Sequence, residues 1–159
     1  MSASSFNQNN MKTLKNLLVV GFFCLAGTLF ADEMMKPEIG GYCPVCYLAA
    51  NKAVKGTEEF KVEHDGKAYY FVSQDAVDAF NKEPEKFLPA YNGYCAFGMA
   101  LGKKFESDPT VFTVVDGVIY LNKDAEIGKK FNEDLKGNIV KADAEWKTME
   151  MAMKEEMKK

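Results

Sequence analysis

Arginine is absent from the chain, since all 20 basic residues are lysine. Arginine supplies the bidentate contacts by which many proteins hold phosphate groups and guanine. The chain is also mildly acidic, with a formal net charge of −3. We therefore exclude nucleic acid as a partner.

Histidine and the common catalytic motifs are equally scarce. His64 is the only histidine, and the sequence has no Ser-His-Asp arrangement, no glycine-rich phosphate motif and no pair of carboxylates at a spacing that suggests acid–base chemistry. We therefore expect a binding protein rather than an enzyme. His64 lies beside a predicted turn, where we interpret it as a turn or surface residue. A role as a metal ligand is the alternative.

Long hydrophobic runs are also lacking. The run from Leu17 to Phe30 follows a lysine-containing segment that begins at Met11, and it is too short to cross a bilayer comfortably. This order, which ends at Ala31, is typical of a secretory signal peptide. We predict that residues 1–31 are a signal peptide, with Met11 as an alternative start. The protein would then be periplasmic in a bacterial envelope, with no membrane span after cleavage.

Cysteine is sparse, and one of the four, Cys24, would leave with the signal peptide. Cys43 and Cys46 form a Cys-Pro-Val-Cys motif, which has three common uses: metal chelation, dithiol–disulfide cycling or a structural bridge. After export, either these two form a disulfide and Cys95 is free, or one site uses all three thiolates. A short helix expected at 48–54 would place its positive N-terminal end near Cys46 and lower the thiol pKa.

Alternating hydrophobic and polar residues predict a β-hairpin at 58–72. An Asp-Gly pair at 65–66 is the expected two-residue turn. Pairing across that turn would put Phe60 opposite Phe71. Ser73 is the expected N-cap of the helix that follows.

The same pattern occurs a second time. Gly93-Tyr-Cys95 repeats Gly41-Tyr-Cys43, and a second hairpin with an Asp-Gly turn at 116–117 precedes a helix that Asp124 would cap. We interpret the pattern as a pseudo-duplicated hairpin–helix unit. The predicted fold class is α+β, with small antiparallel β-hairpins and packed helices.

The repeat predicts a sulfur-lined metal site. In the second unit Cys95 stands at the position of Cys43, and Met99 follows at the position of Tyr47. If the two units face each other, Cys43, Cys46, Cys95 and Met99 converge. Such donors favour Cu(I), with zinc or another soft metal as the alternative.

Several segments resemble a known family. Cys43-Pro-Val-Cys46, Tyr69-Tyr-Phe71 and Glu83-Pro-Glu-Lys-Phe-Leu88 are similar to the YHS domain, a cysteine-bearing module of heavy-metal transport ATPases that is related to the TRASH metal-binding domains. The chain as far as Trp146 resembles exported bacterial YHS-domain proteins of unknown function. The resemblance implies a metal-binding module without a full four-thiol site, because valines stand where such modules carry further cysteines.

These patterns together predict four segments: the signal peptide, a linker at 32–40, a YHS-like domain at 41–146 and a Met/Lys/Glu-rich tail at 147–159. The predicted function is a periplasmic soft-metal-binding protein, for copper foremost, that acts as a chaperone, buffer or sensor. The alternatives are a thiol–disulfide redox protein and a non-catalytic envelope module with a structural disulfide. Besides the metal ion, candidate partners are a metal transporter, another envelope protein and a second copy of the chain in a homodimer.

Overall fold

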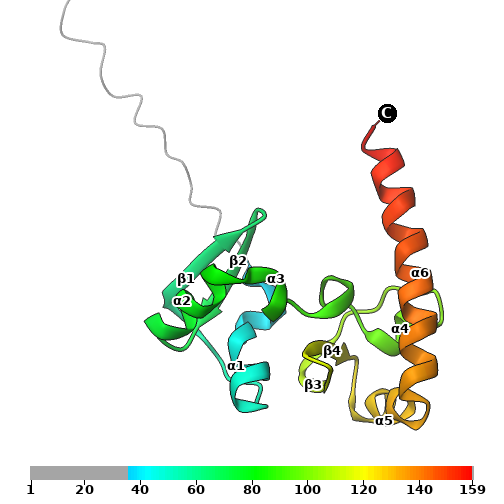
Figure 1. Ribbon diagram of the computed structural model, residues 1–159, viewed down its shortest axis with the longest axis horizontal. Coiled ribbons are helices and arrows are strands. Elements are labelled where there is room, and N and C mark those ends of the chain that lie inside the picture. Colours follow the sequence, from blue (N-terminus) through cyan, green and yellow to red (C-terminus); the bar gives the residue numbers. More distant parts are fainter. Residues whose placement is uncertain (1–35, 159) are drawn as a thin grey trace, which may run out of the picture. The chain divides into compact units, whose positions relative to one another are not determined.

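Two antiparallel β-hairpins and the helices around them make up the structure, a computed structural model that describes residues 36–158 (Figure 1). The predicted signal peptide and the first part of the predicted linker lie outside the described residues, which belong to one compact unit. In chain order the elements are η2 (Glu38–Gly41), α1 (Pro44–Ala50), β1 (Thr57–His64), β2 (Lys67–Phe71), α2 (Gln74–Lys82), α3 (Pro84–Phe87), η3 (Ala90–Gly93), α4 (Ala96–Ala100), β3 (Asp108–Val115), β4 (Val118–Asn122), α5 (Ala125–Glu133) and α6 (Leu135–Glu156).

The first hairpin pairs β1 with β2 and contains one irregularity. Its register is regular from the turn as far as Lys61, which lies opposite Tyr70, but the next pair is Thr57 with Phe71. The unmatched residues of β1 form a bulge, so the predicted pairing of Phe60 with Phe71 is wrong. Alternation in sequence cannot reveal a bulge, because the extra residues change the register and not the composition.

Two predictions about local structure are confirmed. Asp65 and Gly66 form the hairpin turn with φ of 50° and 72°, the left-handed conformations that a two-residue turn of this kind requires and that Asp-Gly adopts readily. The hydroxyl of Ser73 accepts a 3.3 Å hydrogen bond from the backbone N–H of Ala76. Ser73 thereby caps α2, because its hydroxyl gives a hydrogen-bond partner to one N–H of the first helical turn.

The second hairpin and its helix follow the first in order and spacing. Strands β3 and β4 and helix α5 begin and end 51 residues after β1, β2 and α2, and β3 has a bulge between Asp108 and Phe112. The carboxylate of Asp124 caps α5 by accepting a 2.9 Å bond from the N–H of Ile127. The predicted α+β class, with small antiparallel hairpins and packed helices, is confirmed. An internal duplication as the origin of this similarity stays a prediction.

A left-handed turn leads into each of the cysteines Cys43 and Cys95. Residues 39–41, Ile-Gly-Gly, have φ of 54°, 58° and 78°, and residues 91–93, Tyr-Asn-Gly, have φ of 58°, 53° and 79°. Residues other than glycine rarely adopt this conformation, which costs about 1–2 kcal/mol for each of them. Both cysteines are therefore reached through the same uncommon backbone path.

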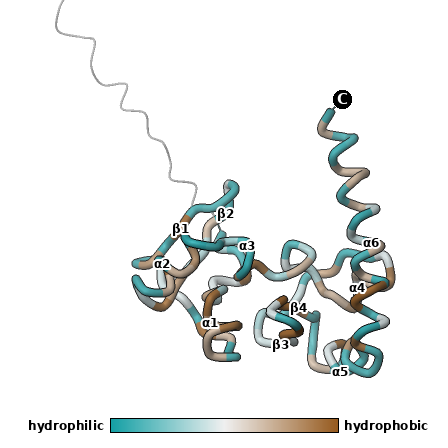
Figure 2. Tube along the Cα trace, in the orientation of Figure 1, coloured by the Kyte–Doolittle hydropathy of each residue, from teal (hydrophilic) through white to brown (hydrophobic). Residues whose placement is uncertain are grey.

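Buried side chains gather in three clusters. The first lies among α1, β2, α2 and α3, and the second lies among η3, α4, β4, α5 and α6. The third consists of Tyr47, Ile119 and Leu121 and joins α1 to β4. Figure 2 shows hydrophobic residues along α1 and β4 and hydrophilic residues at the turn between β1 and β2.

Tyr47 is the side chain that joins the two units most directly. It is fully buried, its hydroxyl donates a 2.8 Å hydrogen bond to the carbonyl oxygen of Pro109, and its ring meets that of Phe112 edge-on at 4.9 Å. Burial raises the pKa of the Tyr47 hydroxyl. The side chain of Tyr47 is therefore part of the core.

Helix α6 continues past the end of the predicted domain. It runs without interruption to Glu156, through most of the segment at 147–159 that was predicted as a Met/Lys/Glu-rich tail. Its first turns pack on α4 and α5, and Trp146 and Met149 contribute to the second cluster. Among the described residues no helix is both long and apolar enough to span a bilayer.

Candidate functional site

The Cys-Pro-Val-Cys motif forms the beginning of α1 instead of preceding the helix. The sequence predicted a helix at 48–54, but α1 begins at Pro44, which stands at its first position. Proline is favoured there because its fixed φ suits a helix and its missing N–H would have no partner within the helix. Cys43 is consequently the N-cap residue, and Cys46 lies in the first turn.

Backbone hydrogen bonds hold this turn in place. The N–H of Cys43 donates a 2.8 Å bond to the carbonyl oxygen of Val54, and the N–H of Cys46 donates a 3.2 Å bond to the carbonyl oxygen of Cys43. Tyr42 also forms a β-bridge with Lys55. The segment that carries both cysteines is therefore held at its start and at its first helical turn.

The two thiols lie close together and away from solvent. Cys43 is 0% exposed and Cys46 is 8% exposed, and a hydrogen bond joins their side chains. Burial, this hydrogen bond and the charge of Cys43 raise the pKa of the Cys46 thiol from 9.0 to about 12. The predicted lowering of the pKa by the helix N-terminus is wrong for Cys46, because loss of solvation outweighs the dipole. Cys43, Cys46 and Cys95 are all free thiols in the structure.

The surroundings of the thiol pair are apolar. The first cluster contains both cysteines together with Tyr69, Phe71 and Phe80 and further side chains of α1, α2 and α3. In such surroundings an ion is stable only when ligands replace its hydration and offset its charge. The site thus suits a bound cation that is held directly by sulfur.

Cys95 occupies the corresponding place in the second unit but has different neighbours. It is the N-cap residue of α4, and its sulfur accepts a 3.4 Å hydrogen bond from the N–H of Gly98. The thiol lies 3.7 Å from Oδ1 of Asn122. Met99 is fully buried in the second cluster, whereas Cys43 and Cys46 belong to the first.

The structure therefore brings together two of the four predicted sulfur ligands. Within residues 36–158, Cys43, Cys46 and Cys95 are not a group whose sulfur atoms all lie within 4.8 Å of one another. Two thiolates bound to one metal ion at about 2.3 Å each are at most about 4.6 Å apart. Cys95 and Met99 as metal ligands stay predictions.

Asn122 is a buried polar residue that the sequence reasoning missed. It is 0% exposed, and its Oδ1 accepts a 3.1 Å bond from the N–H of Phe97, while its Nδ2 has no hydrogen-bond partner among the described residues. In the first unit the position 51 residues earlier is Phe71. That difference is the one sequence signal that could have drawn attention to Asn122.

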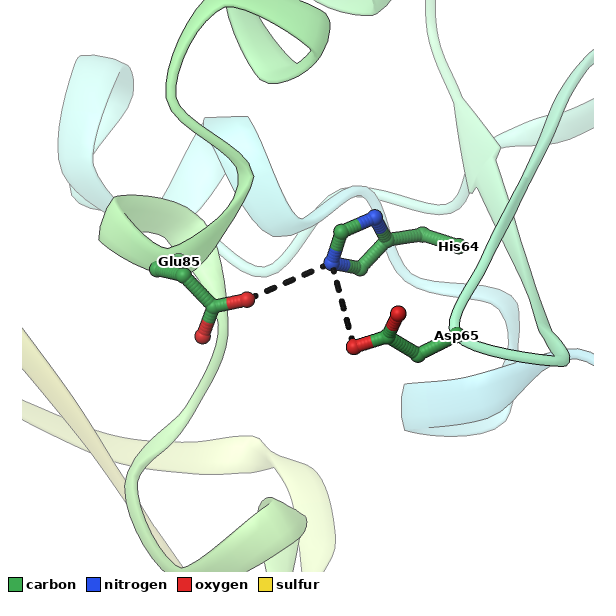
Figure 3. A group of neighbouring side chains, drawn as sticks. All are labelled: His64, Asp65 and Glu85. Atoms are coloured by element: carbon green, nitrogen blue, oxygen red, sulfur yellow. Dashed lines mark hydrogen bonds and ion pairs between the residues drawn. The ribbon is translucent and has the colours of Figure 1, made fainter.

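His64, the remaining predicted ligand, groups with two carboxylates and not with the cysteine sulfur atoms in residues 36–158. Its Nε2 points toward the carboxylates of Asp65 and Glu85 at the edge of the first unit (Figure 3). Glu85 is 21 residues away in the chain, so sequence spacing gave no reason to connect the two.

A comparison with known families identifies the first unit. The family model for the YHS domain matches residues 44–91. This segment is a YHS domain. No curated protein and no solved structure shows significant similarity to the chain.

The YHS domain contains α1, the first hairpin, α2 and α3, and so holds Cys46, His64 and Glu85. Cys43 immediately precedes the matched residues, and Cys95 and Met99 follow them. YHS domains are associated with metal-binding modules, which agrees with two adjacent thiols at the start of the domain. The predicted extension of the domain to residue 146 stays a prediction.

Proposed function

We propose that the protein binds one soft metal ion, Cu(I) foremost, between the sulfur atoms of Cys43 and Cys46. The observation that carries this proposal is the contact between two buried thiols at the start of α1. When the cation binds, both thiols lose their protons to solvent, and each sulfur coordinates the ion as a thiolate. The ion is the cargo of the protein, which acts as a copper chaperone, buffer or sensor in the periplasm.

The number of ligands favours copper over zinc. Thiolates are soft donors that select Cu(I), and zinc sites in proteins are usually tetrahedral with four ligands. Cys43 and Cys46 supply two sulfur atoms, and their other neighbours in the first cluster are hydrocarbon and aromatic groups. A third or fourth sulfur from Cys95 or Met99 stays a prediction. Zinc is therefore the alternative cargo.

The test is a titration of the reduced protein with Cu(I) against a competing chelator. The wild type binds one equivalent, and the variants Cys43→Ser and Cys46→Ser lose affinity by a factor of about 100 or more, because a single thiolate remains. Cys95→Ser is the matched control, since it also removes a buried thiol from an N-cap. Equal affinity for Cu(I) of the wild type and the Cys43→Ser, Cys46→Ser double variant would refute the proposal. A loss in Cys95→Ser as large as in Cys43→Ser shows instead a site with three thiols.

Export is part of the same proposal and rests on residues 1–31. The predicted signal peptide delivers the domain to an oxidising compartment, where a metal transporter or another envelope protein is the candidate recipient of the ion. Intact-mass analysis of protein from a bacterial envelope fraction gives both the N-terminus and the state of the thiols. A chain that retains residues 1–31 contradicts export.

A thiol–disulfide redox role is the second candidate, because two thiols in contact are also placed to form a disulfide. The high pKa of Cys46 counts against it, since the thiolate is the attacking species. Loss of two hydrogen atoms in the intact mass, together with disulfide-reductase activity, would favour this candidate. Metal retained by the purified protein would favour the first candidate, soft-metal binding.

A further inference from the structure

A second group of metal-ligand atoms lies at the edge of the YHS domain, away from any sulfur. Nε2 of His64 is 3.3 Å from Oε1 of Glu85 and 3.7 Å from Oδ2 of Asp65. The three atoms all lie within 4.8 Å of one another (Figure 3). The group therefore presents one nitrogen and two oxygen atoms to a common point.

The imidazole is held more firmly than a surface histidine would be. His64 ends β1, and its side chain is 24% exposed because the ring stands edge-on against Phe80, with centroids 5.7 Å apart and planes at 86°. Phe80 is itself fully buried in the first cluster. The direction in which Nε2 points is thus set by core packing.

The backbone positions the two carboxylates. Asp65 is the first residue of the hairpin turn, with φ of 50°, so its place next to His64 follows from the turn geometry. Glu85 lies in α3, which Pro84 begins and which packs against α1 and α2. A strand end, a turn and a helix therefore each contribute one ligand atom.

The spacing agrees with that of ligands around one ion. Donors at about 2.0–2.1 Å from a tetrahedral metal are about 3.3 Å apart. The distances from His64 Nε2 to the two carboxylates, 3.3 and 3.7 Å, are close to this value. An imidazole with two carboxylates also matches the borderline divalent ions better than Ca²⁺ or Mg²⁺, which prefer oxygen alone.

The neighbouring lysines pair with other residues. Lys67, opposite His64 in the hairpin, lies 3.6 Å from Glu38, and Lys86, next to Glu85, lies 3.5 Å from Glu83. The side chain that both Asp65 and Glu85 approach within 4 Å is instead His64. A divalent cation between them offsets their negative charges.

We propose that His64, Asp65 and Glu85 form a second metal site, which takes a borderline divalent cation such as Zn²⁺ and leaves the remaining positions to water. This site is separate from the proposed Cu(I) site in place and in chemistry. Nitrogen and carboxylate ligands do not depend on the redox state of the cysteines. The YHS domain thus distinguishes two classes of metal ion by the donors of two sites.

The test uses the only histidine as its own reporter. In a Cys43→Ala, Cys46→Ala, Cys95→Ala chain, NMR follows the imidazole signals while Zn²⁺ is added at constant pH. The His64 signals shift and saturate at one equivalent. Glu85→Gln weakens binding by about tenfold or more, since even the outer neighbours of metal ligands contribute that much. Glu83→Gln, two residues away on the same surface, is the matched control and leaves the affinity unchanged.

A shift that does not saturate, or an equal loss in Glu83→Gln and Glu85→Gln, overturns the proposal, because either result indicates diffuse attraction to surface carboxylates. Should the cysteine-free chain not fold, equilibrium dialysis of the reduced full chain against Zn²⁺ decides the matter. His64→Gln then lowers the number of bound ions by one. An unchanged number refutes the second site while the Cu(I) titration still stands.

Discussion

The buried thiol of Cys46 should make the stability of the fold depend on alkaline pH. Its pKa is about 12 in the folded protein and 9.0 ordinarily, so the unfolded chain loses this proton first. The stabilising contribution is complete below about pH 9 and is lost as pH rises toward about 12. The loss is on the order of 1 kcal/mol at pH 10 and on the order of 3 kcal/mol at pH 11.

The assay is urea unfolding of the reduced, metal-free protein between about pH 8 and about 10. Part of the decline in this window comes from Tyr47, Tyr69, Tyr91 and Tyr120, because burial also raises the pKa of each above its ordinary value of 10.0. Cys46→Ala should remove about half of the decline in unfolding free energy between the two pH values. Val45→Ala is the matched control, because it removes buried side-chain volume from the same helix and keeps the thiol.

An equally steep decline in the wild type and Cys46→Ala would refute the reasoning that desolvation controls this thiol. A decline in Val45→Ala that is as small as in Cys46→Ala would refute it as well, since the effect would then follow from packing. If both variants behave as expected, the result supports a Cys46 thiol that remains protonated until a metal ion displaces its proton.

Three further changes test how the site is held. Gly56→Ala should destabilise the fold by about 1–3 kcal/mol or prevent folding, because its Cβ would stand 2.5 Å from the carbonyl oxygen of Tyr70; urea unfolding measures this, and an unchanged midpoint contradicts it. Tyr47→Phe should cost about 1–3 kcal/mol, since the carbonyl of Pro109 loses its 2.8 Å donor; thermal unfolding is the measure, and a neutral effect would mean that water replaces the hydroxyl. Asp124→Ala should lower the free energy of unfolding by about 0.5–2 kcal/mol, because α5 loses its N-cap. Urea unfolding followed by the helical circular dichroism signal measures this loss. An unchanged free energy of unfolding contradicts the prediction.

Features that depend on neighbouring residues could be predicted from the sequence. The Asp65-Gly66 turn and the caps at Ser73 and Asp124 follow from the conformations and side-chain hydrogen bonds open to these residue types. The α+β class followed from these local patterns. The cysteine pair and the YHS resemblance were likewise visible, because both reside in short stretches of sequence.

Features that depend on distant residues could not be predicted from the sequence. Because of the bulge in β1, Phe60 does not pair with Phe71 as predicted, and no residue type in the strand indicates a bulge. The pKa of Cys46 depends on burial by side chains from three other elements, which outweighed the helix N-terminus. The approach of Glu85 to His64 depends on how α3 packs against α1 and α2.

The left-handed turn before each N-cap cysteine bears on the entropy of binding. Residues 39–41 and 91–93 restrict the backbone just before Cys43 and Cys95, and folding has already overcome both the strain and the loss of freedom at these positions. An ion that binds at Cys43 therefore orders very little additional chain. For the proposed Cu(I) site, such preorganisation favours tight binding by few ligands, and Ile39 is then a position from which metal affinity can be tuned without altering any atom that touches the ion.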